Sequence, residues 1–397
     1  MSTSVSLTQN SFSQVVAREW QRLRGSSWDL AMVSWVPLLA VALIVWIFSA
    51  GLAQQLPLAV LDQDHSLLSR QMVRWLQATP GLRVCGQFTN QAEVEHALRS
   101  GAAYAVVQIP PDFSRRLHLG ETAAVTLLHN AQFGTHSGQI QRDVRTVVST
   151  LSAGLELGAR ERRGASPALA RVAQEPLSVR SMTLFNPSLN YEPFLAAALI
   201  PALLHIFAMT AGAWSLGREL RDRSIAEWIT PRHKPAQALA ALAAKLMLPL
   251  LALTLIGTLA LASVSNSAAG AEARIGVMVA LSLFLALSAL IGAALALASG
   301  SLRMALSGTG FLSAPAFAVG GVGFPLLAMP ALARDWANAL PYTHYIRLQT
   351  QQLQMGAPLS SSLHILLGLA LAVLGTAGLC TLLLRYRARR PDTWGQR

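Results

Sequence analysis

The chain alternates long apolar stretches with shorter polar ones. An apolar run of about twenty residues is long enough to cross a bilayer as a helix. Six such runs are present, at 31–52, 193–214, 242–263, 276–298, 305–328 and 362–384. The pattern therefore predicts a polytopic α-helical membrane protein with six transmembrane helices.

Basic residues between the spans predict the orientation, because Lys and Arg concentrate in the cytoplasmic segments of membrane proteins. With both termini inside, the inner segments hold fifteen basic residues and the short outer loops hold only Arg274, Arg334 and Arg347. We therefore expect a multi-pass membrane protein with both termini and a loop at 215–241 in the cytoplasm. The chain then ends in a cytoplasmic tail at 385–397.

The long polar stretch 53–190 has the pattern of a folded domain. Short apolar runs bounded by turn residues predict strands at "PLAVLD", "LRVCGQF", "AYAVVQI" and "AAVTLLHN". Helical spacing appears in "SLLSRQMVRWLQA", in "QAEVEHALRSG" and over about 136–163. This alternation predicts a small mixed α/β domain, inserted after the first span on the periplasmic, extracytoplasmic side.

The cytoplasmic segment 1–30 contains "SQVVAREWQRLRG", which reads as an amphipathic helix. Val16, Trp20 and Leu23 share one face, and Arg18 and Arg22 share the other. We interpret it as an interfacial helix lying on membrane lipid. An ordinary solvated helix is the alternative.

The segment 329–361 is too polar to cross the membrane. Pro330 and Pro341 divide it into short pieces, and Trp336, Tyr342 and Tyr345 are residue types that favour the membrane interface. Short outer-leaflet helices are therefore expected there.

Charge is scarce, at 13% of residues, yet it gathers in "RELRDRSIAEWITPRHKP" from Arg218 to Pro235. Charged residues four apart, such as Glu219 with Arg223 and Arg223 with Glu227, would pair on a helix. The stretch predicts a short charged helix in the cytoplasm that carries an exposed tryptophan. It is either a docking site for a soluble partner or a solvated connection.

We attribute the net charge of +12 to basic residues retained on the cytoplasmic side of the membrane. It does not indicate nucleic-acid binding, because no basic stretch is interleaved with aromatic residues. Lys234 and Lys245 are the only lysines, and neither completes a phosphate-binding Gly-x-x-x-x-Gly-Lys-[Ser/Thr] motif. The chain is therefore not expected to hydrolyse ATP, to bind a metal or to act as an enzyme. The two cysteines, Cys85 and Cys380, are not expected to pair.

One ionisable side chain, His205, lies well inside a predicted span. Such a residue is a functional candidate by default. A histidine that hydrogen-bonds a neighbouring helix is the alternative. No Asp or Glu falls inside the predicted spans, which weakens a proton- or ion-coupled mechanism.

Four stretches together resemble an ABC-2-type permease, the membrane half of an ATP-binding-cassette exporter with a large outer domain after its first span. Two lie in the outer domain, "VLDQDHSLLSRQMVRWLQATPGLRV" and "ALRSGAAYAVVQIPPDFSRRLHLG". The third, "RELRDRSIAEWITP", is similar to the cytoplasmic coupling helix, although a glycine often stands in the family where this chain has Asp222-Arg223-Ser224. The fourth is "FPLLAMPALARDWANALPYTHYIR" before the last span.

The resemblance implies partners and site residues. The coupling element would contact a separate ATPase subunit, which binds ATP and magnesium, whereas this chain holds no cofactor. The implied contact residues are Arg218, Glu219, Arg221, Asp222, Arg223, Glu227 and Trp228. A second permease, identical or paralogous, would complete a dimer, and a periplasmic adaptor could meet the outer domain. In the fifth span, Phe311, Pro315 and Phe317 would lie along the substrate pathway.

The function expected from the sequence is the permease subunit of an ABC-2-type, ATP-driven exporter. It would move a hydrophobic or amphipathic substrate, of the multidrug or lipid-like kind, out across the inner membrane. The alternatives are an ion-coupled secondary transporter and a membrane receptor or scaffold that binds a ligand through residues 53–190.

Overall fold

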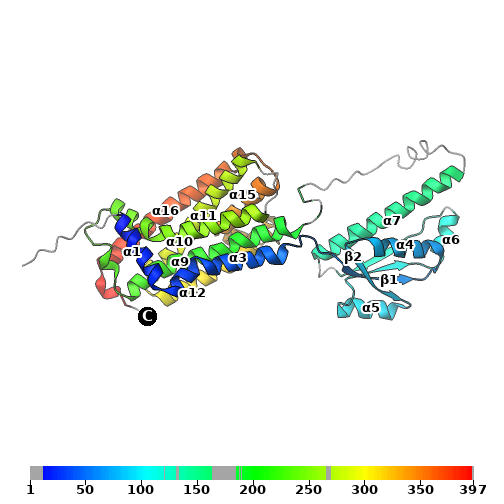
Figure 1. Cartoon of the computed structure of the whole chain (residues 1–397), viewed down its shortest axis with the longest axis horizontal. Helices are drawn as coiled ribbons and strands as arrows, with labels where there is room; N and C mark the ends of the chain where they lie inside the picture. Colours follow the sequence, from blue (N-terminus) through cyan, green and yellow to red (C-terminus); the bar gives the residue numbers. More distant parts are fainter. Residues whose placement is uncertain are drawn as a thin grey trace, which may run out of the picture. The chain divides into compact units, whose positions relative to one another are not determined.

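The computed structural model describes residues 12–119, 121–130, 134–162, 185–186, 188, 190–264 and 270–395. Contacts divide the chain into two compact units. Met1–Ala50 and Asn190–Arg397 form a helical bundle, and Gly51–Leu189 forms an α/β unit (Figure 1). The predicted boundary of the α/β unit, 53–190, lies within two residues of the observed one.

The bundle is built from helices of very different length. Its elements are α1 (Phe12–Gly25), α2 (Ser27–Val33), α3 (Trp35–Phe48), the π-helix η2 (Glu192–Ala196), α9 (Ala197–Arg221), η3 (Ile225–Glu227), α10 (Pro235–Val264), α11 (Ala271–Ser299), α12 (Leu302–Ser313), α13 (Ala316–Val319), η4 (Leu326–Ala328), α14 (Ala331–Ala339), α15 (Pro341–Gln349), the π-helix η5 (Thr350–Gln354), η6 (Leu359–Ser362), α16 (Leu363–Ala388) and η7 (Pro391–Thr393).

Five helical segments of the described chain are long and apolar enough to cross a membrane, one fewer than the sequence predicts. They are Ser27–Phe48, Glu192–Arg221, Pro235–Val264, Ala271–Ser299 and Leu359–Ala388. Each overlaps a predicted span. Most run beyond the predicted ends, because helical hydrogen bonding continues into polar residues that hydropathy excludes.

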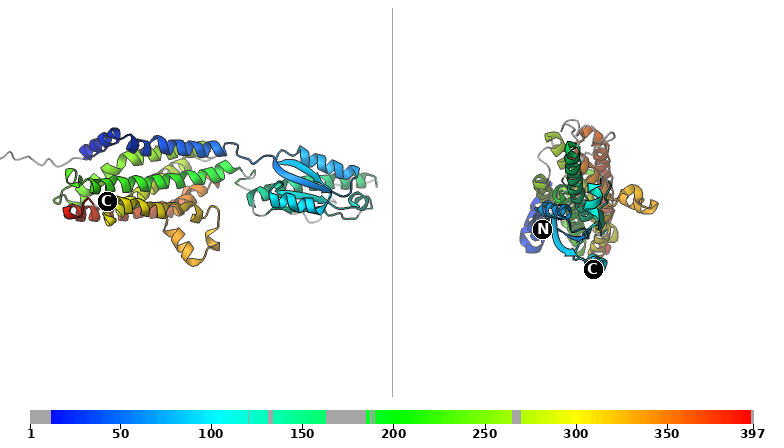
Figure 2. Two further views of the ribbon diagram at one scale, coloured as in Figure 1. Left: turned by 90° about the horizontal axis from the view of Figure 1, so that it is seen from below. Right: turned by 90° about the vertical axis from the view of Figure 1, so that its right-hand side faces the viewer.

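The predicted fifth span, 305–328, is not a continuous helix. α12 ends at Ser313, and α13 is a single turn that begins after Pro315. Proline lacks an amide hydrogen, and the glycine-rich stretch after Val319 does not sustain a helix, so the chain leaves the bundle here. Figure 2 shows the orange segment that includes α14 standing away from the other helices.

Small residues bring α9 and α11 close together in the middle of the bundle (Figure 1). A Cβ atom at Gly212 would collide with the carbonyl oxygen of Ala289, and one at Gly292 would collide with that of Met209. Such glycines allow two helix backbones to approach within contact distance, which is a common way to hold membrane helices together.

Polar side chains of α15 repair a break in α9. Pro201 lies inside α9 and cannot donate to the carbonyl of Ala197 four residues earlier. The side chain of Gln349 donates to that carbonyl, with 2.7 Å from Nε2 to O. The hydroxyl of Tyr342 donates to the next one, Ala198 O, at 2.9 Å.

The prediction that two tyrosines of this segment lie at the membrane interface is wrong. Tyr342 and Tyr345 are fully buried in the bundle core, where Tyr345 stacks on Phe284 with 4.7 Å between ring centroids. Of the three aromatic residues considered, Trp336 remains partly exposed, at 37%. The short helices expected within 329–361 are present as α14 and α15, with turns on either side.

The α/β unit follows the predicted order of strands and helices. Its elements are β1 (Leu56–Asp62), α4 (Leu67–Ala78), β2 (Leu82–Phe88), α5 (Gln91–Ser100), β3 (Ala105–Ile109), α6 (Phe113–His118), β4 (Thr126–His129) and α7 (Gly134–Arg162). The sheet order is β2-β1-β3-β4, with β1 parallel to β2 and β3, and β4 antiparallel to β3.

Alternation along β1 explains the layers of this unit. Leu58 and Val60 face a core shared with α4 and α7, whereas Ala59 and Leu61 face α5. Both faces of the sheet are covered, so the buried positions of its central strands β1 and β3 are apolar.

The "DQDHS" motif that carries part of the family resemblance builds a turn. The carboxylate of Asp62 accepts hydrogen bonds from the backbone amides of Asp64 and His65, at 3.0 and 3.1 Å, and from the hydroxyl of Ser69 at 2.7 Å. The hydroxyl of Ser66 caps α4 by accepting from the Ser69 amide. The motif therefore joins β1 to α4.

Candidate coupling site

Eight charged side chains meet at one end of the bundle, where α1, α2, α9 and α10 converge. This charge cluster consists of Arg18, Glu19, Arg22, Asp29, Arg218, Glu219, Glu227 and Lys245. The four cations balance the four anions.

Each helix contributes for a local reason. The buried face of α1 is formed by Val15, Glu19 and Leu23, which lie four residues apart along the helix. Asp29 lies in the first turn of α2. Its backbone amide donates a hydrogen bond to the hydroxyl of Ser26, the residue that caps the start of this helix. A carboxylate there is stabilised by the helix dipole. Lys245 lies on the buried face of α10.

The charges alternate along a continuous path. Asp29 pairs with Arg218, whose Nη2 lies 2.5 Å from Glu19 Oε1. Lys245 Nζ then bridges Glu19 Oε2 at 2.6 Å and Glu219 Oε1 at 2.7 Å. The path joins three segments that are far apart in the sequence.

Glu219 is the hub at the other end of the path. It accepts from Arg18 Nη1 at 2.9 Å and from Arg22, and the hydroxyl of Ser224 also donates to it. Arg18 Nη2 reaches Glu227 Oε2 at 2.6 Å. Burial alone would lower the pKa of Arg18. Its hydrogen bonds and attraction to Glu219, and then to Glu227, outweigh burial and hold that pKa above the ordinary value, so Arg18 stays charged.

Burial of the charge cluster holds its helices firmly together. The side chains of Glu219 and Lys245 have no exposed surface, and that of Glu19 has 3%. Removing one partner of such a pair leaves an uncompensated charge in a poorly polar site, which costs about 3–5 kcal/mol. The helices that carry these charges are therefore expected to move together.

The predicted coupling helix does not exist as a separate element. α9 continues through Arg221, and Arg223 adopts a left-handed backbone with φ of 57° that ends helical spacing. The predicted pairing of Glu219 with Arg223 and of Arg223 with Glu227 is therefore wrong. Arg223 lies in the turn that follows α9, and Glu227 lies in η3. Glu219 lies in the last turn of α9 and is held by α1 and α10 instead.

The structure separates the seven predicted contact residues into two groups. Arg218, Glu219 and Trp228 are buried, and Trp228 packs with Lys245 Nζ 5.3 Å from its ring centroid. The tryptophan expected on the surface is thus part of the core. The exposed members are Arg221, Asp222, Arg223 and Glu227. These four residues and the exposed Ala226 are called the exposed turn below.

The N-terminal helix is present but presents a different face to the bundle. Arg18 and Arg22 point to Glu219, whereas Trp20 is 44% exposed and has Arg24 over its ring at 5.1 Å. Arg18 and Arg22 share one face of α1, and that face lies toward the bundle because a buried carboxylate on α9 attracts them. The predicted apolar face is divided, since Leu23 is buried and Trp20 is not.

His205 is buried and bonds a neighbouring helix. Its Nδ1 lies 2.7 Å from the hydroxyl of Ser288, and its ring stacks on Phe284 at 5.3 Å. The one hydroxyl hydrogen of Ser288 goes to the carbonyl of Phe284, so Nδ1 of His205 donates. This geometry matches the packing alternative.

The candidates for a substrate pathway are His205 and three residues of the predicted fifth span, and those three lie in different surroundings. Phe311 is 73% exposed and has an edge contact with Trp336 at 6.1 Å. Pro315 precedes α13, and Phe317 packs against the bundle core.

Three members of the charge cluster, Glu19, Asp29 and Lys245, are missing from the sequence-based site. Lys245 offers a signal, since it is a lysine within an apolar helix. Glu19 lies four residues from both Val15 and Leu23, so the helical spacing of these two apolar residues also indicates that Glu19 is buried. Asp29 precedes an apolar run like an ordinary helix start, so its partner on α9 is not visible from local pattern.

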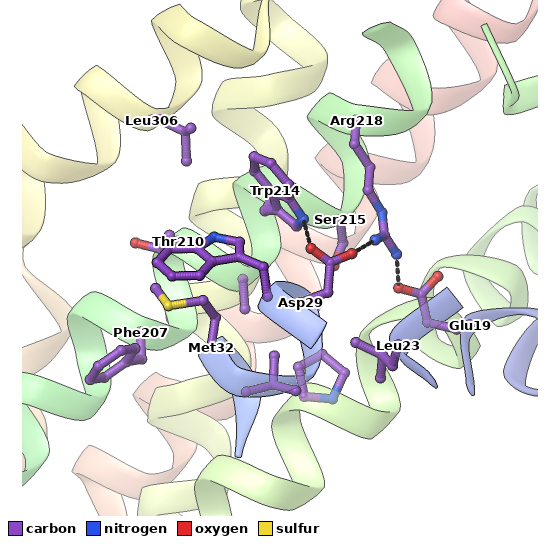
Figure 3. Close-up of a pocket in the computed structure, with 14 residues that line it drawn as sticks. Glu19, Leu23, Asp29, Met32, Phe207, Thr210, Trp214, Ser215, Arg218 and Leu306 are labelled. Atoms are coloured by element: carbon purple, nitrogen blue, oxygen red, sulfur yellow. Dashed lines mark hydrogen bonds and ion pairs between the residues drawn. The ribbon is translucent and has the colours of Figure 1, made fainter. Parts of the chain in front are cut away.

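A cavity of about 170 Å³ adjoins the cluster. Figure 3 shows Asp29 between Trp214 and Arg218, with Glu19 beyond the arginine. In the part of the chain that the structure describes, no group of three or more His, Cys, Asp or Glu side chains could hold a metal ion. What the cluster offers is mechanical connection and buried charge.

Comparison with known proteins identifies the family. A family model described as "ABC-2 family transporter protein" matches residues 28–385, which is most of the chain. No curated protein matches it. The resemblance seen in the sequence is confirmed, and the chain belongs to the ABC-2 family of transporter proteins.

Proposed function

We propose that this chain is the membrane subunit of an ATP-driven exporter that moves a hydrophobic or amphipathic substrate out across the bacterial inner membrane. Membership of the ABC-2 family implies an ATP-binding-cassette ATPase as partner in general. The partner would bind ATP and magnesium, and its closure on ATP would supply the work of transport. A second permease subunit would complete the assembly, and a periplasmic adaptor would meet the α/β unit.

The observation that carries this proposal is the connection between the exposed turn and the charge cluster. Glu227 in the turn bonds Arg18, which in turn bonds Glu219 in the last turn of α9. A force applied to the turn therefore reaches α9 and α10 first through the exposed pair of Glu227 with Arg18, and then through Glu219, whose side chain is buried. The exposed charges that a partner would meet are those of Arg221 and Asp222, which pair with each other at 2.8 Å, and that of Arg223.

Co-purification tests the partnership. The chain is expressed with a candidate ATPase and purified in lipid nanodiscs, where its presence is expected to change the rate of ATP hydrolysis. Arg223→Glu is expected to weaken the complex by at least tenfold. Arg389→Glu, at another exposed arginine near the end of α16, is the matched control and should leave the complex intact.

Two results would refute the proposal. One is full ATPase binding by a double variant that carries Arg223→Glu together with a charge reversal at Asp222. The other is transport that persists without any ATPase and stops when the ion gradient is removed, which would favour a secondary transporter.

A further inference from the structure

The cavity beside the charge cluster has an apolar wall and a charged floor. Its apolar lining comes from α1, α2, α9, α10 and α12, namely Leu23, Met32, Val33, Phe207, Ala211, Pro249 and Leu306. Two tryptophans, Trp28 and Trp214, complete the wall. Cavities of about 150 Å³ accommodate a ring the size of benzene. The volume of about 170 Å³ therefore suits one ring or a short branched chain.

The floor is formed by Asp29, Glu19 and Arg218. Asp29 is the last member of the alternating path of charges. It forms an ion pair with Arg218, which also pairs with Glu19, and Arg221 is attracted to it as well. Its other oxygen accepts from Trp214 Nε1 at 3.0 Å. A carboxylate has about four lone-pair positions, so Asp29 can accept further bonds from a ligand.

The guanidinium of Arg218 is already engaged with both carboxylates. Nη1 and Nη2 of Arg218 bond the two carboxylates. Its Nε has no partner in the described structure and has almost no accessible surface, so an acceptor in the cavity does not reach it. An anionic group would therefore meet two carboxylates beside a guanidinium that is already paired with both of them, whereas a cation would meet a carboxylate with capacity to spare.

The aromatic residues favour a cation as well. Positive groups are attracted to the face of a tryptophan ring, and more strongly when water is excluded. Trp214 already has Arg221 over its ring at 5.6 Å. Trp28 is 65% exposed at the start of a helical segment long and apolar enough to cross the membrane. It offers an aromatic face where an apolar ligand would enter from lipid.

We propose that this cavity binds a hydrophobic organic cation, with its apolar part against Phe207 and Met32 and its ammonium group beside Asp29. The inference deepens the proposed function, on which it rests for the cytoplasmic location of this end of the bundle. It names the chemical class of the substrate and an entry site at the inner leaflet.

The test uses three small probes of similar size with the full-length chain in nanodiscs and no ATPase. They are benzyltrimethylammonium, its neutral isostere neopentylbenzene, and the anion benzenesulfonate. Binding is followed by quenching of tryptophan fluorescence, after subtraction of empty nanodiscs. The cation is expected to bind at least tenfold more tightly than either of the other probes.

Two variants locate the site. Asp29→Asn is expected to weaken binding of the cation at least tenfold. Ala211→Phe fills the cavity without changing any charge, so it should abolish binding even if Asp29→Asn folds poorly. Asp392→Asn, at an exposed aspartate near the end of the chain, is the control and should bind as the unmodified chain does.

Equal affinity for the cation and the neutral isostere would overturn the proposal, as would undiminished binding by a folded Ala211→Phe variant. Because no ATPase is present, failure here is separate from failure of the proposed function. A chain that binds benzyltrimethylammonium but no ATPase would retain the site and lose the transport role.

Discussion

Substitution of Lys245 by methionine tests whether the charge cluster holds the bundle together. The change removes the ammonium group that bridges Glu19 and Glu219 at 2.6 and 2.7 Å, and it leaves a net charge of −1 in a buried site. At an effective dielectric constant of about 20, each contact is worth roughly 6 kcal/mol of attraction, largely offset by loss of hydration. The expected net loss is about 3–5 kcal/mol of unfolding free energy.

The Glu19→Gln variant supplies the matched test, because Lys245→Met combined with Glu19→Gln restores a neutral cluster. A shift of about 2 °C per kcal/mol predicts a fall of roughly 6–10 °C in the unfolding midpoint of Lys245→Met, measured by scanning fluorimetry in nanodiscs. The double variant should recover at least half of this loss. Additive losses in the double-mutant cycle would refute the reasoning, since they would mean that the two charges do not interact.

Three further outcomes are expected in the same stability assay. Gln349→Leu should cost about 1–3 kcal/mol, because it uncovers a buried carbonyl. The cost should largely disappear in a Pro201→Ala background, which restores the missing backbone donor, and an unchanged cost there would contradict this account. Gly292→Ala should destabilise the chain by about 1–3 kcal/mol, because the added Cβ collides with α9. Gly310→Ala, where the added Cβ meets open space, should be neutral. Equal effects of the two substitutions would argue against close packing of the helices. Arg223→Gly should stabilise the chain by about 1 kcal/mol, because glycine adopts the left-handed backbone without strain, and a loss of stability would show that the side chain matters more.

The sequence predicts the α/β unit well because its signals are local. The short apolar run "PLAVLD" and the helical apolar spacing over about 136–163 are each complete within one element. The observed β1 and α7 begin and end within two residues of those expectations. Turn chemistry at Asp62 and Ser66 adds to the same result.

The site is less predictable because its contacts connect distant positions. Glu219 looks like a member of a helical surface pair, yet Arg18 and Lys245 hold it from 201 and 26 residues away. Local pairing rules also assume that a helix continues, and the left-handed residue Arg223 ends it. The predicted span at 305–328 fails for a related reason, since hydropathy does not register the break at Pro315.

The central claim, that the exposed turn faces the cytoplasm and docks an ATPase, is tested most directly by labelling a cysteine at Ala226. The variant Ala226→Cys is made in a chain that lacks Cys85 and Cys380, and it is treated with a membrane-impermeant maleimide. We predict labelling in inverted vesicles alone, and protection when the ATPase subunit is bound. Labelling of intact, right-side-out vesicles, or no protection by a bound ATPase, would contradict the account.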